Sequence, residues 1–106
     1  MGELHHECGV AAVAYLEQEH GPPTLHTPRH PEQASRLIPR MLLDMQNRGQ
    51  LAAGMTSFNS RRDAILETYK QLGTVAEAFR LNHRAKFESI MREMDGPVAI
   101  GHVRYA

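Results

Sequence analysis

Short apolar segments alternate with polar ones along the chain, and the spacing of the apolar residues predicts the secondary structure. Residues 8–16 (CGVAAVAYL) are small and apolar, which predicts a strand buried on both faces. Residues 52–59 and 64–70 flank the polar turn SRRD and predict a β-hairpin. The segment VAIGHVRY, residues 98–105, predicts a further strand. The chain is therefore expected to carry strands near both of its ends.

Two amphipathic helices are predicted from apolar residues that recur at i, i+3, i+4 and i+7. Pro39 is tolerated only in the first turn of the first helix, and the Asn-Arg-Gly that ends at Gly49 can close it. Thr74 and Glu77 form a capping box, which predicts that another helix starts after Gly73. The apolar stripes are Ile38, Met41, Leu42 and Met45 in the first helix and Phe87, Ile90, Met91 and Met94 in the second.

Residues 17–34 differ from the rest of the chain because they contain four prolines and no periodicity. They are predicted to form a surface loop. The predicted order of elements is strand, helix, two strands, helices and strand, which indicates an α/β or α+β class with helices packed on a sheet. A chain of 106 residues forms one domain at most.

Composition narrows the functional classes. Twelve Lys and Arg residues balance twelve Asp and Glu residues, so the chain has no net field to attract nucleic acid or an acidic membrane. A single cysteine cannot form an internal disulfide, residues 1–7 lack the apolar core of a signal peptide, and no apolar run is long enough for a membrane helix. These features predict a cytoplasmic protein without nucleic-acid or membrane partners.

The single cysteine, Cys8, is the first candidate for chemistry. A cysteine thiol needs a base or positive surroundings to become a reactive thiolate. If the chain is cut between Glu7 and Cys8, the new α-amine of Cys8 could accept the thiol proton. The alternative is that Cys8 is a small buried hydrophobe at the start of a strand, and on chemistry alone that inert reading is favoured.

A metal site is not predicted. The four consecutive residues His5, His6, Glu7 and Cys8 cannot all turn toward one ion, since metal sites draw on spaced ligands. The loop histidines are expected to be solvated; they are His20, His26 and His30. We therefore expect no metal and no cofactor in this segment.

Three segments taken together favour the catalytic reading of Cys8 over the inert one. They are ECGV at 7–10, QNRGQLAAGM at 46–55 and GHVRYA at 101–106. In this order they resemble the glutaminase domain of class II glutamine amidotransferases, and they look most like the amidophosphoribosyltransferase branch. Residues 66–79 (LETYKQLGTVAEAF) also resemble the strand, glycine and helix that this family places there. The resemblance covers most of the chain apart from the 17–34 loop.

The resemblance implies an α+β fold of the N-terminal-nucleophile hydrolase type, an αββα sandwich in which two β-sheets stack between helical layers. Residues 1–7 would correspond to a propeptide, and residues 8–106 to an incomplete glutaminase domain that contains the proline-rich loop at 17–34. Cleavage between Glu7 and Cys8 would then supply the free α-amine that the chemistry of Cys8 requires.

The resemblance also implies a reaction. The sulfur of Cys8 attacks the side-chain amide of glutamine, ammonia leaves, and water releases glutamate. The ammonia passes to an acceptor, which in this branch is phosphoribosyl pyrophosphate in purine synthesis. The implied partners are glutamine and a phosphoribosyltransferase domain that this chain lacks, and self-association stays open.

Three residues gain expected roles by matching the motifs. Arg104 matches the arginine that grips the α-carboxylate of glutamine, for which a planar guanidinium is well suited; its alternative is a surface arginine with a weak ion pair. Arg48, with Gly49, matches a pair near the nucleophile, although the same residues also suit a helix end. Strand alternation sends His102 and Arg104 to one face and Tyr105 to the other, where Tyr105 is expected to pack.

The family pattern continues beyond Ala106 with a Thr-Gly, an Asn-Gly pair that forms the oxyanion hole, and an Asp that holds the substrate amine. Loss of one oxyanion donor costs about 10²- to 10³-fold in rate. We therefore expect the 106-residue chain alone to be inactive. The competing hypothesis is a non-catalytic α/β fragment or binding module in which Cys8 is an inert core residue.

Overall fold

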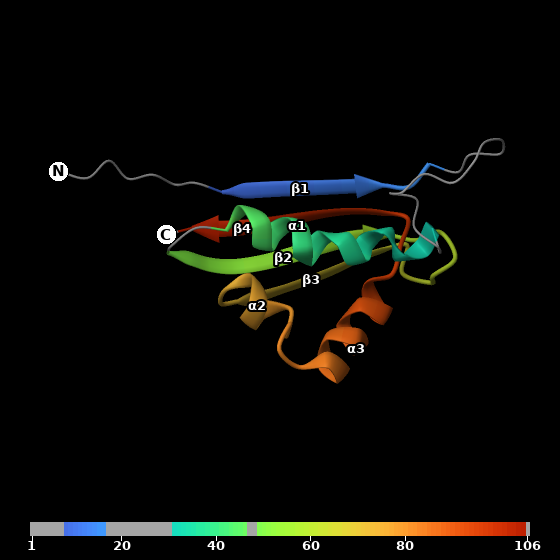
Figure 1. Cartoon of the computed structure of the whole chain (residues 1–106). Helices are drawn as coiled ribbons and strands as arrows, with labels where there is room; N and C mark the ends of the chain where they lie inside the picture. Colours follow the sequence, from blue (N-terminus) through green and yellow to red (C-terminus); the bar gives the residue numbers. More distant parts are fainter. Residues whose placement is uncertain (1–7, 17–30, 47–48, 106) are drawn as a thin grey trace, which may run out of the picture.

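A computed structural model of the chain describes residues 8–16, 31–46 and 49–105 (Figure 1). A 3₁₀ helix (Pro31–Arg36) runs directly into the first α-helix. The strands are β1 (Gly9–Ala14), β2 (Gln50–Phe58), β3 (Leu66–Leu72) and β4 (Val98–Tyr105). The helices are α1 (Leu37–Met45), α2 (Val75–Ala78) and α3 (Arg84–Met94).

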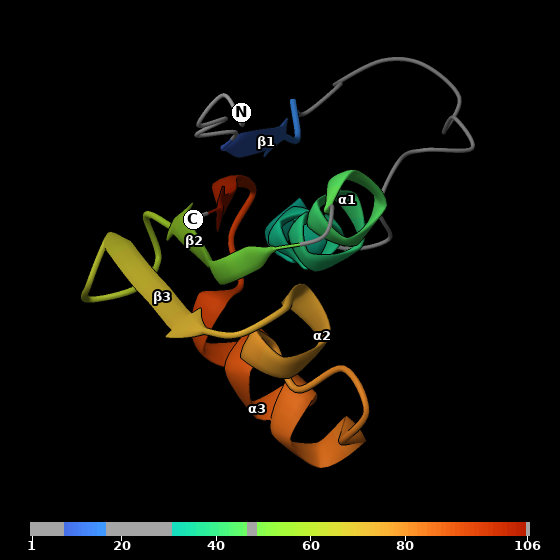
Figure 2. The ribbon, with the colours of Figure 1, turned by 90° about the vertical axis from the view of Figure 1, so that its left-hand side faces the viewer.

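The four strands form one antiparallel sheet in the order β1-β4-β2-β3. The last strand of the chain thus lies inside the sheet, between β1 and β2. The helices lie on one face of this sheet, with α1 against β1 and β4 and with α2 and α3 below β2 and β3 (Figure 2). The described residues therefore form a two-layer α+β structure.

Small residues let α1 lie close to the sheet. Gly101 of β4 faces the helices, and a Cβ atom there would collide with Ile38 and stand 3.1 Å from Cδ1 of Leu42. Gly9 of β1 faces the same way, and its Cβ would stand 2.7 Å from the sulfur of Met45. The apolar stripe predicted for this helix thus packs against the glycines of β1 and β4.

The core continues under β2 and β3, where α2 and α3 pack. Met55, Phe79 and Met91 are almost completely buried. The ring of Tyr69 lies 5.6 Å from that of Phe79, and its hydroxyl donates a hydrogen bond to the carbonyl of Ala78. The predicted capping box is present, because Thr74 Oγ1 accepts from the amide of Glu77 and Glu77 Oε1 accepts from that of Thr74.

Most predicted elements are confirmed, namely the hairpin, the amphipathic helices and the strand at 98–105, but three predictions are wrong. The strand within 8–16 is not buried on both faces, because β1 is an edge strand and Val10 is 70% exposed. Residues 31–34, placed in the loop, belong to the 3₁₀ helix; residues 17–30 lie outside the described part. The helix ends at Met45, because Gln46 is already extended, and Gly49 takes its left-handed φ of +84° at the entry to β2.

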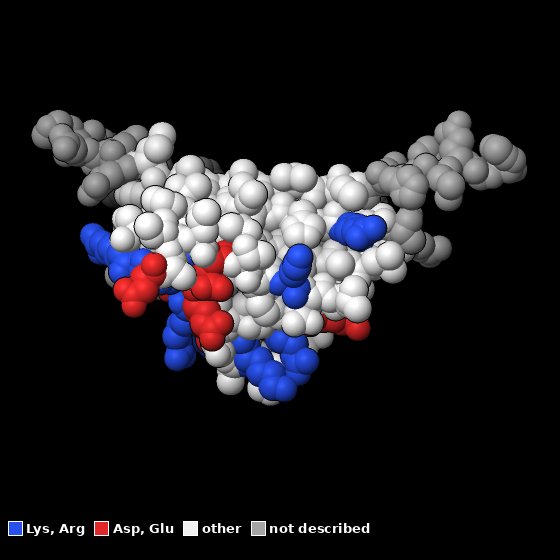
Figure 3. Space-filling model, turned by 180° about the vertical axis from the view of Figure 1, so that it is seen from behind, with Lys and Arg blue, Asp and Glu red and all other residues white. Residues whose placement is uncertain are grey.

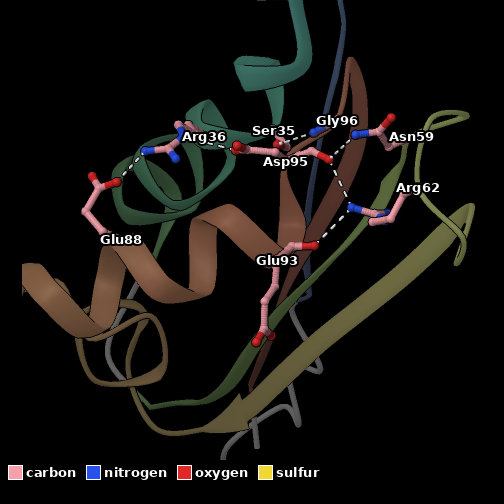
Figure 4. A network of polar contacts seen from close by, with 8 residues as sticks. All are labelled: Ser35, Arg36, Asn59, Arg62, Glu88, Glu93, Asp95 and Gly96. Atoms are coloured by element: carbon pink, nitrogen blue, oxygen red, sulfur yellow. Dashed lines mark hydrogen bonds and ion pairs between the residues drawn. The ribbon is translucent and has the colours of Figure 1, made fainter.

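A group of polar side chains fixes the start of β4, and we call it the β4-start cluster (Figure 4). The guanidinium of Arg36 donates to Glu88 at 2.8 Å and to Asp95 at 3.0 Å. The hydroxyl of Ser35 accepts from the amide of Gly96 at 3.0 Å, and the Ser35 amide donates to the Gly96 carbonyl. These bonds join the 3₁₀ helix to the segment between α3 and β4.

Arg62, in the turn between β2 and β3, completes this cluster. Its Nη1 donates to the carbonyls of Glu93 and Asp95, and its Nη2 donates to the carbonyl and hydroxyl oxygens of Ser57. The carbonyls at the end of a helix lack partners within the helix, and a cation there is favourable. Arg62 therefore fastens the hairpin turn to the end of α3.

Candidate functional site

The sheet face opposite the helices carries the predicted site residues, and we call it the open face. Figure 3 views the molecule from this side, and its upper part, over β1 and β4, is mostly free of charged side chains. None of the described strand residues that the register assigns to this face is acidic. They are Val10, Ala12, Ala14, Val98, Ile100, His102, Arg104, Ala52, Gly54, Thr56, Phe58, Leu66, Thr68, Lys70 and Leu72.

The pairing of β1 with β4 brings together the two main candidates. Gly9 pairs with Val103 in an antiparallel register, and both residues face the helices. Cys8 directly precedes Gly9 and Arg104 directly follows Val103, so one further step of this register would set Cys8 across from Arg104, on the open face. Side chains directly opposite on antiparallel strands have Cβ atoms about 4.5–5.5 Å apart. The last pair of the register, Gly9 and Val103, joins residues 94 positions apart in the sequence, and Cys8 and Arg104 adjoin it.

Arg104 is available for a ligand in this arrangement. Its side chain is exposed, and among the described residues it forms no ion pair. On the open face its cross-strand neighbour on β2 is Ala52, which has no polar side chain. The exposed position fits both a substrate-binding arginine and a surface arginine, and no ion pair of Arg104 is present among the described residues.

Cys8 is exposed as a free thiol directly before β1. This position disagrees with the reading of Cys8 as an inert core residue, because the core of the described chain lies on the other face of the sheet. A nucleophile must be reached by its substrate, so the exposure is compatible with the catalytic reading.

The other predicted site residues lie at the same end of the sheet or outside the described residues. Gly49 is exposed and precedes β2, whose first residue, Gln50, pairs with Tyr105. Tyr105 donates a hydrogen bond to the carbonyl of Met45 and packs against the core, as the alternation predicts. Arg48 and Glu7 lie outside the described residues, so their predicted roles stay predictions.

Three further observations concern metal ions, membrane helices and surface hollows. Within residues 8–16, 31–46 and 49–105, no group of three His, Cys, Asp or Glu side chains could bind a metal ion. None of the helices in this part is long and apolar enough to cross a membrane. A surface hollow lined by Tyr15, Asn59, Arg61 and Pro97 lies at the end of β1 away from Cys8, so it is separate from the candidate site.

Sequence reasoning missed the β4-start cluster completely. Its members come from the 3₁₀ helix, the hairpin turn and the end of α3, and the pair Arg36–Asp95 is separated by 59 positions. Contacts over such distances leave no periodic signal. The Asp-Gly-Pro that follows α3 is the available sequence signal, and it indicates only the end of a helix.

Comparison with known proteins relates the chain to one enzyme family. It is 35% identical over 98% of its length to amidophosphoribosyltransferase 3, chloroplastic, of Arabidopsis thaliana. It is 38% identical over 94% of its length to amidophosphoribosyltransferase 2, chloroplastic, of the same plant. The chain spans only 15% and 14% of these relatives.

The other comparisons add no second family. No protein-family profile matches the chain, and no solved structure matches it significantly. The similarity to amidophosphoribosyltransferases extends over nearly the whole chain and agrees with the resemblance of its motifs. The chain is therefore a relative of the amidophosphoribosyltransferases, within the class II glutamine amidotransferases.

Proposed function

We propose that this chain is the nucleophile-bearing part of a glutamine amidotransferase, in which Cys8 hydrolyses the side-chain amide of glutamine. The observation that supports the proposal is the register of β1 and β4: its last pair, Gly9 and Val103, adjoins an exposed thiol on one strand and, on the other, an exposed arginine without an ionic partner among the described residues. A thiol and a guanidinium on one open surface are the groups that such a substrate requires.

The proposed chemistry begins with Cys8 as the first residue of the mature chain, after removal of residues 1–7. Its α-amine accepts the thiol proton, and the sulfur attacks the side-chain carbonyl carbon of glutamine. The amide C–N bond breaks, the nitrogen takes the proton, and ammonia leaves a thioester on Cys8. Water then cleaves the thioester, which releases glutamate and restores the thiol.

Arg104 is proposed to bind the α-carboxylate of glutamine. A guanidinium can form two parallel hydrogen bonds with a carboxylate, which fixes the orientation of the substrate as well as its position. Since Arg104 and Cys8 adjoin the last pair of β1 and β4, the carboxylate would be bound by one strand while the side-chain amide reaches the sulfur on the other. Gly49, which precedes β2 at the same end of the sheet, is proposed to support the nucleophile together with Arg48.

The open face supports the proposed αββα sandwich. Its half away from Cys8 carries exposed apolar side chains, with Ile100 53% and Leu66 66% exposed. Thr56 and Thr68 are joined there by a 2.8 Å hydrogen bond, which satisfies part of the hydrogen-bonding capacity of their hydroxyls. Contiguous apolar surface of this kind marks a contact region. We propose that a second sheet covers it in a longer polypeptide.

The acceptor of the ammonia is proposed from the relatives, whose names describe them as amidophosphoribosyltransferases. On this basis the longer polypeptide would add a phosphoribosyltransferase domain and aminate phosphoribosyl pyrophosphate. The cytoplasm remains the predicted compartment from the sequence, whereas the Arabidopsis relatives are described as chloroplastic.

The direct test is Cys8→Ser in the product of the parent gene. We expect glutamine hydrolysis to fall by at least about 10⁴-fold, as when a catalytic nucleophile is removed. Thr68→Ala, on the same face but distant from Cys8, serves as the matched control and should keep its activity. Intact mass should show the loss of residues 1–7. Retained hydrolysis in Cys8→Ser would contradict the proposal and favour a non-catalytic binding module.

A further inference from the structure

We infer that His102, seated over Gly54, is a positioning residue that confines Arg104 to the side of the sheet where Cys8 lies. The inference rests on the proposed function, because it gives a role to a neighbour of the proposed substrate-binding arginine. It starts from the fact that His102 and Arg104 are two residues apart on β4 and face the same side.

The position of His102 follows from the missing side chain of Gly54. These residues pair between β4 and β2, and Cε1 of His102 lies 2.8 Å from the point where a Cβ of Gly54 would stand. A real Cβ would not tolerate that contact. The imidazole therefore leans toward β2 and lies over the backbone of Gly54, which is buried although it belongs to the open face.

Lys70 closes the same space from β3. It pairs with Gly54 on the other side, and its Cβ also lies 2.8 Å from the same point. The volume above Gly54 is thus filled by the imidazole and by the base of the Lys70 side chain. Among the described residues Lys70 has no acidic partner, so no neighbouring carboxylate neutralises its positive charge.

This arrangement limits where the guanidinium of Arg104 can lie. Toward β2 the guanidinium would lie over Ala52. Two residues further along β2, the space above Gly54 is already occupied by the imidazole of His102. Lys70, on β3 beyond Gly54, carries a positive charge that disfavours a second cation on that side. Toward β1 the neighbour is Cys8. The guanidinium is consequently favoured on the Cys8 side, where the substrate carboxylate is needed, and less conformational freedom is lost on binding.

The test is a steady-state comparison of variants in the active parent protein. We expect His102→Ala to raise the KM for glutamine about tenfold and to leave kcat within about twofold, because the effect is on binding. Gly54→Ala should raise KM as well but also lower stability and kcat, because its Cβ would stand 2.8 Å from the backbone oxygen of Tyr69 as well as from the imidazole. His102→Phe, which refills the space with a ring, should keep KM near that of the unmodified protein. Thr56→Ala is the matched control on the same face and should change neither constant.

Two results would overturn the inference while leaving the proposed function intact. In the first, the enzyme depends on Cys8 but His102→Ala leaves the KM for glutamine unchanged. A lower kcat caused by partial unfolding of the variant would not alter this conclusion. The other is a His102→Phe variant that is as impaired in KM as His102→Ala. A protein without glutaminase activity, or one that keeps it in Cys8→Ser, overturns the proposed function, and this inference falls with it.

Discussion

The polar residues at the two ends of β4 differ in whether they have hydrogen-bond partners within the described chain. At its start, Arg36, Asp95 and Arg62 are bound to one another and to backbone carbonyls. At its end, Arg104 and His102 face the open side of the sheet with no acidic partner among the described residues. Both ends are rich in cations, but only one end has its hydrogen-bonding capacity satisfied within the described chain.

The difference indicates which end is structural and which can bind a ligand. Polar groups that are removed from water need partners, and the β4-start cluster supplies them to three separate segments. An arginine left without a partner retains its capacity for a carboxylate from elsewhere. The contrast predicts that changes at the start of β4 reduce stability, whereas changes at its end reduce substrate binding.

The largest effect on stability is expected for Arg62→Ala. The change removes bonds to the carbonyls of Glu93, Asp95 and Ser57, which hold the hairpin turn to the end of α3; among the described residues the Asp95 carbonyl keeps only the donor from Asn59. We expect the free energy of unfolding to fall by about 2–4 kcal/mol, measured by urea denaturation. Arg104→Ala is the matched control and should stay within about 0.5 kcal/mol. Equal losses in the two variants would remove the contrast between the two ends of β4.

A smaller loss is expected for Ser35→Ala. The buried hydroxyl of Ser35 accepts from the buried amide of Gly96, and alanine leaves that amide without its partner. We expect a loss of about 1–2 kcal/mol in the same measurement. Ser89→Ala, at an exposed position of α3, is the control and should be near neutral. A neutral Ser35→Ala would mean that water or a shifted backbone replaces the hydroxyl.

At the other end of β4, Arg104→Lys should affect binding and leave stability unchanged. Lysine keeps the charge but cannot form the paired hydrogen bonds of a guanidinium with a carboxylate. We expect the KM for glutamine to rise about tenfold with an unchanged urea midpoint, since about 1.4 kcal/mol corresponds to one such factor. An unchanged KM would show that Arg104 does not bind the substrate.

The smallest effect is a dependence of stability on pH through Glu88. The hydrogen bond from Arg36 lowers the pKa of this carboxyl below its usual 4.5. Because the pKa is lower in the folded chain, the stabilisation is present above the usual value and is lost as the pH falls through the lowered one. Urea midpoints from pH 6 downward should decrease less in Glu88→Gln than in the unmodified chain. Parallel curves would show that the pair contributes nothing.

Local patterns predicted the elements well, because periodicity and capping act over a few residues. The stripe from Ile38 to Met45, the Thr74–Glu77 box and the alternation of His102 with Tyr105 are all found in the structure. The pairing of β1 with β4 could not be read in this way, since it joins opposite ends of the chain. Its consequence, Cys8 across from Arg104, was accessible only through the family resemblance.

The most direct test of the central claim is covalent labelling by a glutamine-like diazoketone in the parent protein, with the modified residue located by peptide mass spectrometry. The account predicts that the label is on Cys8, that excess glutamine protects it, and that Arg104→Lys slows the labelling without changing the stability of the fold. A label on another residue, or labelling of Cys8 that neither glutamine nor Arg104→Lys affects, would contradict the assignment of Cys8 and Arg104 to one glutamine site.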